Sequence, residues 1–134
     1  MNKTKESLNK IIELPMNPKG LENFSLNCYM NSLIQCLYHV KELRTSFIDP
    51  SKYSSETQQV CFNFSNVMNG LTYSNKSYYS PKEFKDTFAK MSSLFSGRKG
   101  GDVSDLLRFL ISSILTEISI ENSENNSEEE EEDN

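Results

Sequence analysis

The sequence predicts a mostly α-helical fold with about four helices, and three observations support this prediction. Apolar residues recur at steps of three and four along segments between residues 20 and 120, which is the spacing of one face of a helix. Proline, glycine, asparagine and aspartate stand between these segments, where helices usually begin and end. No segment shows a convincing strand pattern, and the sequence contains no internal repeat.

The composition divides the chain into three parts. Residues 1–19 are polar and include two prolines, which predicts a flexible, turning lead-in. Residues 20–120 are expected to hold the ordered helices. Residues 121–134 carry eight of the 19 acidic residues and no basic one, which predicts a disordered acidic tail because like charges repel and little is available to bury. Such a tail either keeps the chain soluble or docks a basic partner.

The first helix is expected from Cys28 to about Phe47, where Asp49-Pro50 ends it. Its apolar residues cover most of the circumference, which is typical of a central helix packed by several neighbours. The narrow polar seam on this helix consists of Asn31, Gln35 and Glu42.

Two further helices are expected in the middle of the chain. The second covers residues 56–71, with Asn69-Gly70 as its end signal. The third follows Ser80, which would be its N-cap, with Pro81 at the first helical position and Glu83 completing a capping box. The apolar face of this third helix would comprise Phe84, Phe88, Met91 and Phe95.

The fourth helix is expected after a glycine-rich loop, with Asp102 as its cap. Its apolar stripe is wide and runs from Val103 to Ile118. The loop glycines are Gly97, Gly100 and Gly101, and the stripe consists of Val103, Leu106, Leu107, Leu110, Ile111, Ile114, Leu115 and Ile118.

Composition also excludes several classes of function. Without residues 121–134 the remaining 11 acidic residues stand against 14 basic ones, and no basic stripe with interleaved aromatic residues is present, so nucleic-acid binding is not expected. No apolar run is long enough to span a membrane and no signal peptide is recognisable, so we expect a cytoplasmic or nuclear protein without membrane contact.

Cysteine and histidine are too few for a metal centre or a disulfide framework. The three cysteines are irregularly spaced, which predicts free thiols in a reducing compartment. A zinc site needs about four ligands, whereas these cysteines and the single His39 include no C-x-x-C pair. We therefore expect no metal and no other cofactor.

One cysteine is placed to react rather than to pack. A reactive thiol must be partly ionised, and the N-terminus of a helix favours the thiolate. Cys28 falls in the first turn of the first helix, with Asn27 as its expected N-cap, whereas Cys36 and Cys61 fall inside helices and are expected to fill space. Cys28 is therefore the candidate nucleophile, although position alone leaves a packing role open, because free cysteine is often buried.

The residues around Cys28 carry a specific pattern. The stretch GLENFSLNCYMNSLIQCL, residues 20–37, resembles the cysteine box of the ubiquitin-specific proteases, which are papain-like deubiquitinases. The positions that match the family pattern G-L-x-N-x-G-N-T-C-Y-M-N-S-x-x-Q-x-L are Gly20, Leu21, Asn23, Cys28, Tyr29, Met30, Asn31, Ser32, Gln35 and Leu37. The later stretch GGDVSDLLRFL is similar to the family's Q-Q-D-A-x-E-F-L, which places Asp102 and Asp105 at its acidic positions.

The resemblance implies a fold and a reaction. The fold would be the helical N-terminal, or thumb, subdomain of a papain-like cysteine protease. Cys28 would attack the carbonyl after the last glycine of ubiquitin to give an acyl-enzyme, and Asn23 would direct its side-chain amide at the oxyanion. Asp102 and Asp105 would face the arginines of the ubiquitin tail, and helix capping is an equally good role for both. Ubiquitin or ubiquitinated proteins would be the partners.

The sequence departs from the family pattern near the nucleophile and lacks a catalytic base. Ser25, Leu26 and Asn27 replace glycine, asparagine and threonine, and Gly100 and Gly101 replace the paired glutamines. The family's histidine box would lie further downstream, and His39 would be roughly 16 Å from Cys28 along one helix, too far to deprotonate the thiol. We therefore expect the N-terminal part of a catalytic domain that is inactive without its C-terminal half. The alternative is a non-catalytic helical binding or scaffold module, or the relic of an enzyme.

Overall fold

The computed structural model describes residues 19–23, 28–95 and 101–132. Within them lie five α-helices, two short 3-10 helices and two strands of two residues each, which confirms the mostly helical fold. Several positions discussed above lie outside the described residues: 1–18, Ser25, Leu26, Asn27, Gly97 and Gly100. In chain order the elements are β1 (Gly20–Leu21), α2 (Cys28–Tyr38), α3 (Lys41–Ser46), η1 (Pro50–Lys52), α4 (Gln59–Tyr73), β2 (Tyr78–Tyr79), α5 (Lys82–Met91), η2 (Ser93–Phe95) and α6 (Val103–Glu132).

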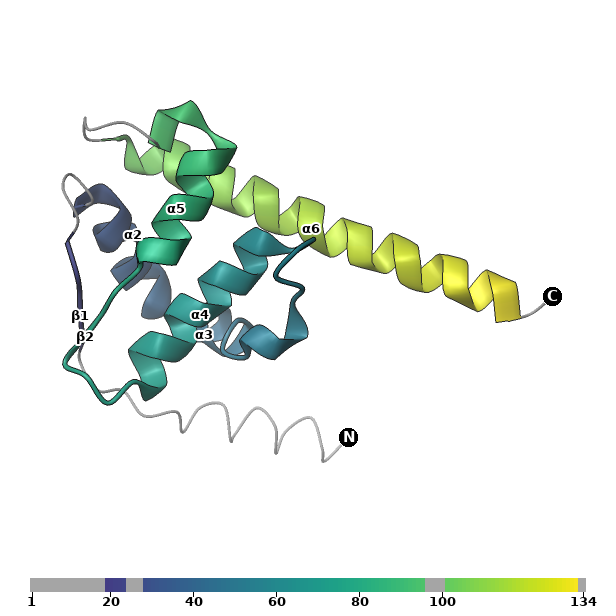
Figure 1. Cartoon of the computed structure of the whole chain (residues 1–134), viewed down its shortest axis with the longest axis horizontal. Helices are drawn as coiled ribbons and strands as arrows, with labels where there is room; N and C mark the ends of the chain where they lie inside the picture. The colour runs from purple at the N-terminus through teal and green to yellow at the C-terminus, as the bar shows by residue number, and fades with distance from the viewer. Residues whose placement is uncertain (1–18, 24–27, 96–100, 133–134) are drawn as a thin grey trace.

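The central helix of the fold is α4, which contacts η1, β2, α5 and α6 (Figure 1). More than half of its residues are buried, so it is enclosed on most sides as a core helix must be. A series of phenylalanine rings links α4 to its neighbours, with centroids 4.6–6.4 Å apart between successive contacts. The rings belong to Phe47, Phe64, Phe84, Phe88, Phe95 and Phe109.

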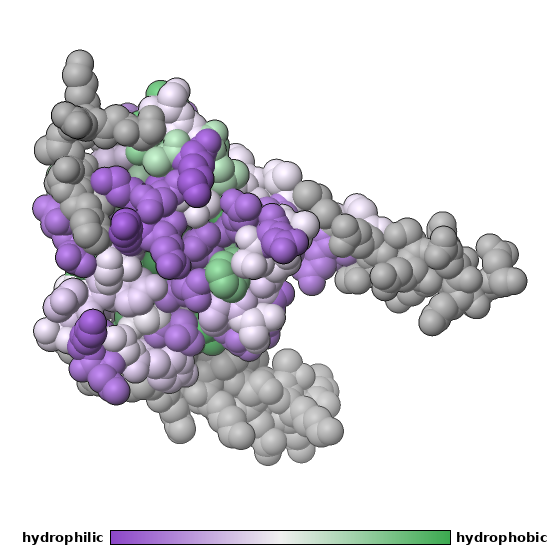
Figure 2. Space-filling model, viewed as in Figure 1, coloured by the Kyte–Doolittle hydropathy of each residue, from purple (hydrophilic) through white to green (hydrophobic). Residues whose placement is uncertain are grey.

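The outer side of α5 gives the molecule a hydrophilic face. The side chains of Lys82, Glu83, Asp86 and Lys90 are exposed on this helix, whereas Phe84 and Phe88 are buried beneath it. Figure 2 shows hydrophilic side chains gathered over most of the face that α5 covers. The spacing of Phe84 and Phe88 in the sequence predicts this one-sided pattern. Met91, predicted for the same apolar face, is instead exposed, and Phe95 is buried beyond the end of α5, in η2.

The predicted single helix over residues 28–47 is wrong, because the structure divides it into α2 and α3. Val40 adopts an extended backbone between them, with φ −81° and ψ 103°. The buried Arg44 stabilises the break, because its guanidinium donates to the Tyr38 carbonyl over 2.9 Å and lies 5.3 Å above the Tyr38 ring. The apolar residues seemed to surround one helix because two helices with different buried faces follow each other in the sequence.

The boundaries of the next two helices also differ from the prediction. Asn69-Gly70 does not end α4, which continues to Tyr73. Gly70 instead lies against the Tyr79 ring, which occupies the space that a side chain at position 70 would need. The predicted N-cap of α5, Ser80, is wrong, since Pro81 is the N-cap and makes no side-chain hydrogen bond to the helix end.

The N-terminus of α4 is capped by a residue from α6. The buried Glu117 accepts hydrogen bonds from the backbone N–H groups of Val60 and Cys61, over 2.9 Å and 2.8 Å. The N-cap residue of α4 itself, Gln58, makes no side-chain hydrogen bond that caps the helix. Two N–H groups that have no partner inside α4 are thus satisfied by one carboxylate, which also suits the positive end of the helix.

The fourth predicted helix corresponds to α6, and its predicted cap is confirmed because the Asp102 carboxylate accepts from the backbone N–H of Ser104 over 2.8 Å. The backbone of α6 continues as helix through Glu132, beyond the expected end near residue 120, and projects from the body of the molecule (Figure 1). The disorder of residues 121–134 in solution stays a prediction. None of the helices in the described ranges combines the length and apolarity that crossing a membrane requires.

Candidate active site

The candidate nucleophile Cys28 is the first residue of α2, and its side chain is exposed. The first N–H groups of a helix have no carbonyl partner within it, so this end attracts negative charge. One turn further, the Ser32 hydroxyl donates to the Cys28 carbonyl over 2.8 Å. The structure thus places an exposed thiol in the first turn of α2, and the role of Cys28 as nucleophile stays a prediction.

The other two cysteines differ from each other. Cys61 is completely buried in α4, and burial together with the nearby Glu117 raises the pKa of its thiol. Cys36 was expected to fill space inside a helix, but it is exposed on α2, so that expectation is wrong. The two exposed thiols therefore belong to the same helix, at its first residue and in its last turn.

The candidate oxyanion residue Asn23 follows a short segment that the sequence did not predict to be a strand. Within it, β1 pairs in parallel with β2, and the flanking backbone bonds run from Gly20 N–H to the Ser77 carbonyl over 3.2 Å and from Glu22 N–H to the Tyr79 carbonyl over 2.9 Å. Strands of two residues show no alternation in a sequence, which explains why pattern analysis missed them.

Two amide side chains of α2 hold the other side of this segment. Asn31 donates from Nδ2 to the Glu22 carbonyl over 3.2 Å, and Gln35 donates from Nε2 to the Lys19 carbonyl over 2.9 Å. The segment is therefore held between β2 and α2, with backbone bonds on one side and side-chain bonds on the other.

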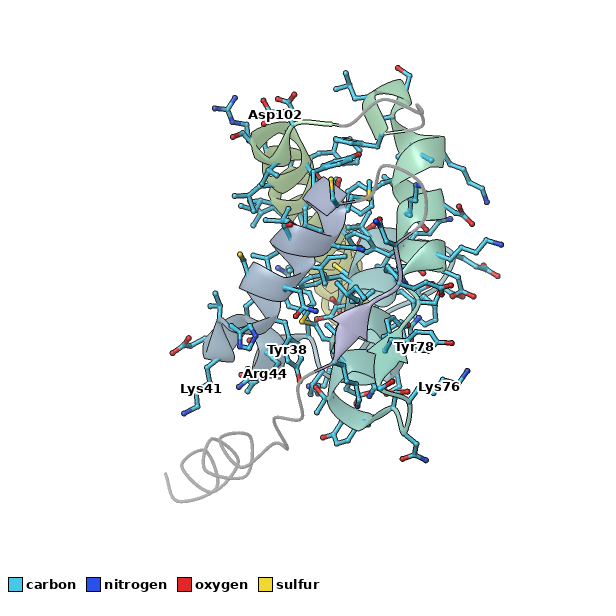
Figure 3. The ribbon with its side chains drawn as sticks, turned by 90° about the vertical axis from the view of Figure 1, so that its left-hand side faces the viewer. Tyr38, Lys41, Arg44, Lys76, Tyr78 and Asp102 are labelled. Atoms are coloured by element: carbon cyan, nitrogen blue, oxygen red, sulfur yellow. The ribbon has the colours of Figure 1, made fainter. Side chains whose placement is uncertain are left out.

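The order of these bonds shows the direction of the segment. As the chain advances from Lys19 to Glu22, its partner on α2 changes from Gln35 to Asn31, so the segment runs toward the end of α2 that begins with Cys28. Figures 1 and 3 both show it passing alongside α2 in the opposite direction. Asn23, which is exposed, is the next residue along this path.

The two acidic candidates lie at the start of α6, next to the start of α2. Asp102 and Asp105 are both exposed, and one oxygen of Asp102 is engaged in the helix cap. Gly101 lies directly against the Tyr29 ring, so that a Cβ at position 101 would come within 2.6 Å of a ring carbon. Burial raises the pKa of the Tyr29 hydroxyl. The structure thus brings the two sequence motifs together at one end of the helical body.

His39 lies at the opposite end of α2. It is exposed just after the helix ends, and its ring meets the edge of the Tyr38 ring with centroids 5.6 Å apart. Figure 3 shows Asp102 near the start of α2 and Tyr38 at the far end. His39 is therefore separated from Cys28 by the length of the helix. Among the described side chains, no group of three or more histidine, cysteine or acidic residues is placed to hold a metal ion.

Comparison with known proteins decides the family. The family model described as ubiquitin carboxyl-terminal hydrolase matches residues 19–133. The chain belongs to the ubiquitin carboxyl-terminal hydrolase family. The match covers β1, Cys28 and both acidic candidates, so the predicted resemblance to the ubiquitin-specific proteases is confirmed.

Curated members of this family are similar to the chain over most of its length. Usp2 of Drosophila melanogaster is 31% identical over an alignment of 99 residues, and the match covers 71% of this chain and 10% of the relative. Ubiquitin carboxyl-terminal hydrolase 12 of Saccharomyces cerevisiae is 32% identical over an alignment of 110 residues, and the match covers 71% of this chain and 9% of the relative. Ubiquitin carboxyl-terminal hydrolase 2 of Rattus norvegicus is 30% identical over an alignment of 106 residues, and the match covers 74% of this chain and 17% of the relative. The chain thus spans less than a fifth of the length of these relatives.

Sequence reasoning missed three features of this hydrolase-family site. These are the bonds of Asn31 and Gln35, the Tyr29–Gly101 contact, and β1 itself. A signal for the first was visible, since Asn31 and Gln35 are amides one turn apart in the polar seam of an otherwise apolar helix. The contact between Gly101 and Tyr29 had no signal in the sequence. The replacement of the family's glutamine by Gly101 indicated only that a side chain had been lost.

Proposed function

We propose that this chain supplies the nucleophile-bearing part of a thiol-dependent deubiquitinase, which hydrolyses the bond between the C-terminus of ubiquitin and another protein. The observation that carries the proposal is the exposed Cys28 at the start of α2, beside the start of α6 and its two aspartates. The family membership supports the same reaction class. The partner would be ubiquitin or a ubiquitinated protein.

The chemistry would proceed in two steps at Cys28. The thiolate sulfur adds to the carbonyl carbon of the scissile bond, and the amine leaves with a proton as the acyl-enzyme forms. Water then adds to the thioester, which releases the ubiquitin carboxylate and restores the thiol. In each step negative charge develops on the carbonyl oxygen, where the Asn23 amide and the N–H groups at the start of α2 would stabilise it.

Asp102 and Asp105 would bind the arginines of the ubiquitin tail. Both carboxylates are exposed and lie on the same helix end as the contact between Gly101 and Tyr29. A guanidinium can use two N–H groups on one carboxylate, which makes aspartate a suitable partner. The cap formed by Asp102 leaves this possible, since one oxygen atom accepts from Ser104.

We propose that another part of the catalytic domain would supply the general base. The chain contains one histidine, and His39 lies at the wrong end of α2. A cysteine hydrolase needs a base within hydrogen-bond reach of the sulfur. We therefore expect the 134-residue chain alone to give no hydrolysis of ubiquitin conjugates.

A chimera tests the proposal. The segment of the rat hydrolase 2 that aligns with this chain is replaced by the corresponding segment of this chain, and cleavage of a fluorogenic ubiquitin substrate is measured. We expect activity in the chimera, and a loss of about a thousandfold or more in Cys28→Ser, because a hydroxyl is a far poorer nucleophile at neutral pH. Cys36→Ser on the same helix is the matched control and should retain activity. Equal activity of the chimera and its Cys28→Ser variant would exclude the catalytic role.

The second candidate is a non-catalytic helical binding or scaffold module. The exposed apolar side chains of α6 favour it, since Val103, Ile111 and Leu115 have exposed fractions of 40%, 50% and 60%. Such a surface is typical of a protein contact. Under this alternative Cys28→Ser would leave the function of the chain unchanged.

A further inference from the structure

Asn31 and Gln35 connect the first residues of the described chain to α2. Each side chain is half-buried and donates one hydrogen bond to a backbone carbonyl, of Glu22 and Lys19 respectively. The sequence separations are 9 and 16 residues, so these bonds hold a distant segment and are unrelated to the helix's own hydrogen bonding.

The order and spacing of the two bonds direct the Lys19–Glu22 segment toward the end of α2 that carries Cys28. Asn31 is three residues after Cys28, which is ~4.5 Å along the helix axis. The residue after Glu22 advances by ~3.3 Å in an extended chain, in the direction of that helix end. Asn23 is therefore delivered to about the level of Cys28 along α2.

The amide oxygen of Asn31 shows that this arrangement carries a cost. Asn31 Oδ1 is buried and has no hydrogen-bond partner among the described residues, which is unfavourable for a polar atom. A leucine of similar size would avoid that cost at this position. The bond to Glu22 therefore explains why position 31 carries an amide, whereas the stability of the helix does not.

We propose that Asn31 and Gln35 are positioning residues of the active site: they clamp the Lys19–Glu22 segment and so set the position of Asn23 relative to Cys28. The inference rests on the proposed function for the role of Asn23. The clamp acts through the carbonyl groups of the segment, while β2 holds its N–H groups. Both side chains would act through this segment and not on the substrate itself.

The test uses the full chain and the double variant Asn31→Leu with Gln35→Met, which removes both donors without adding charge or losing helix propensity. Nuclear Overhauser effects between the side-chain amide protons of Asn23 and the β-protons of Cys28 are measured by NMR. We expect them in the unmodified chain and expect their loss in the variant. We also expect the amide protons of Gly20 and Glu22 to exchange with solvent about tenfold faster, whereas those in the middle of α4 do not change.

Asn69→Leu is the matched control. Asn69 also donates from a helix to the backbone carbonyl of a distant residue, Ile48, over 3.1 Å, but it lies on α4 away from Cys28. It should leave the Asn23 and Cys28 signals unchanged. The single variant Gln35→Met should show an intermediate loss, and it serves if the double variant does not fold.

The outcomes separate the clamp from the reaction. Overhauser effects that persist in the double variant would overturn the clamp while leaving the role of Asn23 intact. Their absence from the unmodified chain would overturn both. Loss of the effects in the variant supports the clamp whether or not the chimera cleaves ubiquitin.

Discussion

At the scale of single residues, the three cysteines show how position in a fold changes one chemical group. Cys28 begins α2 and Cys36 lies in the last turn of that helix, both exposed, whereas Cys61 is enclosed by α4 and α6. Helix ends and burial act on a thiol in opposite directions, because the N-terminus favours negative charge and an apolar interior disfavours it. The surroundings therefore predict three different reactivities.

Alkylation with iodoacetamide at neutral pH should follow the order Cys28, Cys36, Cys61. We expect Cys28 to react about threefold or more faster than Cys36, because it lies at the helix N-terminus. Cys61 should not react in the folded chain, because its raised pKa keeps the thiol protonated and its side chain is inaccessible. Peptide mapping by mass spectrometry gives the three rates. In urea the rates should become similar, and equal rates in the folded chain would contradict the placement of Cys28.

At the scale of elements, the contact between α4 and α6 depends on one carboxylate. Glu117 spans the start of α4 with both oxygens and lies in the interior of the molecule. The side chain of Gln58, the residue before α4, donates a longer hydrogen bond of 3.3 Å to Glu121, which lies on α6 like Glu117. The start of the central helix is thus tied to α6.

Glu117→Gln should destabilise the fold by about 2 kcal/mol, because a hydrogen bond to a charged group is lost and an amide donor then faces a backbone N–H. Urea unfolding followed by circular dichroism measures this difference. The control Glu83→Gln changes an exposed carboxylate of α5 and should stay within about 0.5 kcal/mol of the unmodified chain. Equal midpoints for the two variants would show that the cap contributes nothing.

The elements that the sequence predicted are those with several turns of regular spacing. The stripe of α6 and the phenylalanines of α5 repeat often enough to indicate a helix and its buried face. The break at Val40 was hidden because the bond from Arg44 to the Tyr38 carbonyl, six residues back, leaves no mark in the spacing of the apolar residues. The start of α2 at Cys28 was predictable from local sequence, whereas the approach of Gly101 to Tyr29 required the packing of two distant helices.

At the scale of the whole molecule, the two sides of α6 have different neighbours. Leu106 and Leu110 are buried against the body, while the open face of α6, defined by Val103, Ile111 and Leu115, is exposed. The wide apolar stripe in the sequence therefore forms two surfaces of α6. The body of the molecule covers the one with Leu106 and Leu110 and leaves the other exposed.

Substitution on the two sides of α6 should have different consequences. Leu110→Ala should cost about 2–5 kcal/mol of unfolding free energy, because it leaves a cavity in the core. Ile111→Gln combined with Leu115→Gln should change stability by less than about 1 kcal/mol, because both side chains already face water. Thermal and urea unfolding compare the variants. A large loss of stability in the glutamine variant would mean that the open face is covered within the chain itself.

The contact between Gly101 and Tyr29 has a consequence for attempts to restore the family sequence. Glutamine at position 101 would need the space that the Tyr29 ring occupies, so the ring would have to move away from the start of α6. The family pattern combines a tyrosine at position 29 with a glutamine at position 101, so the two side chains can coexist only where the ring lies elsewhere. Reverting position 101 alone would therefore shift the Tyr29 ring and disturb the junction of the two motifs.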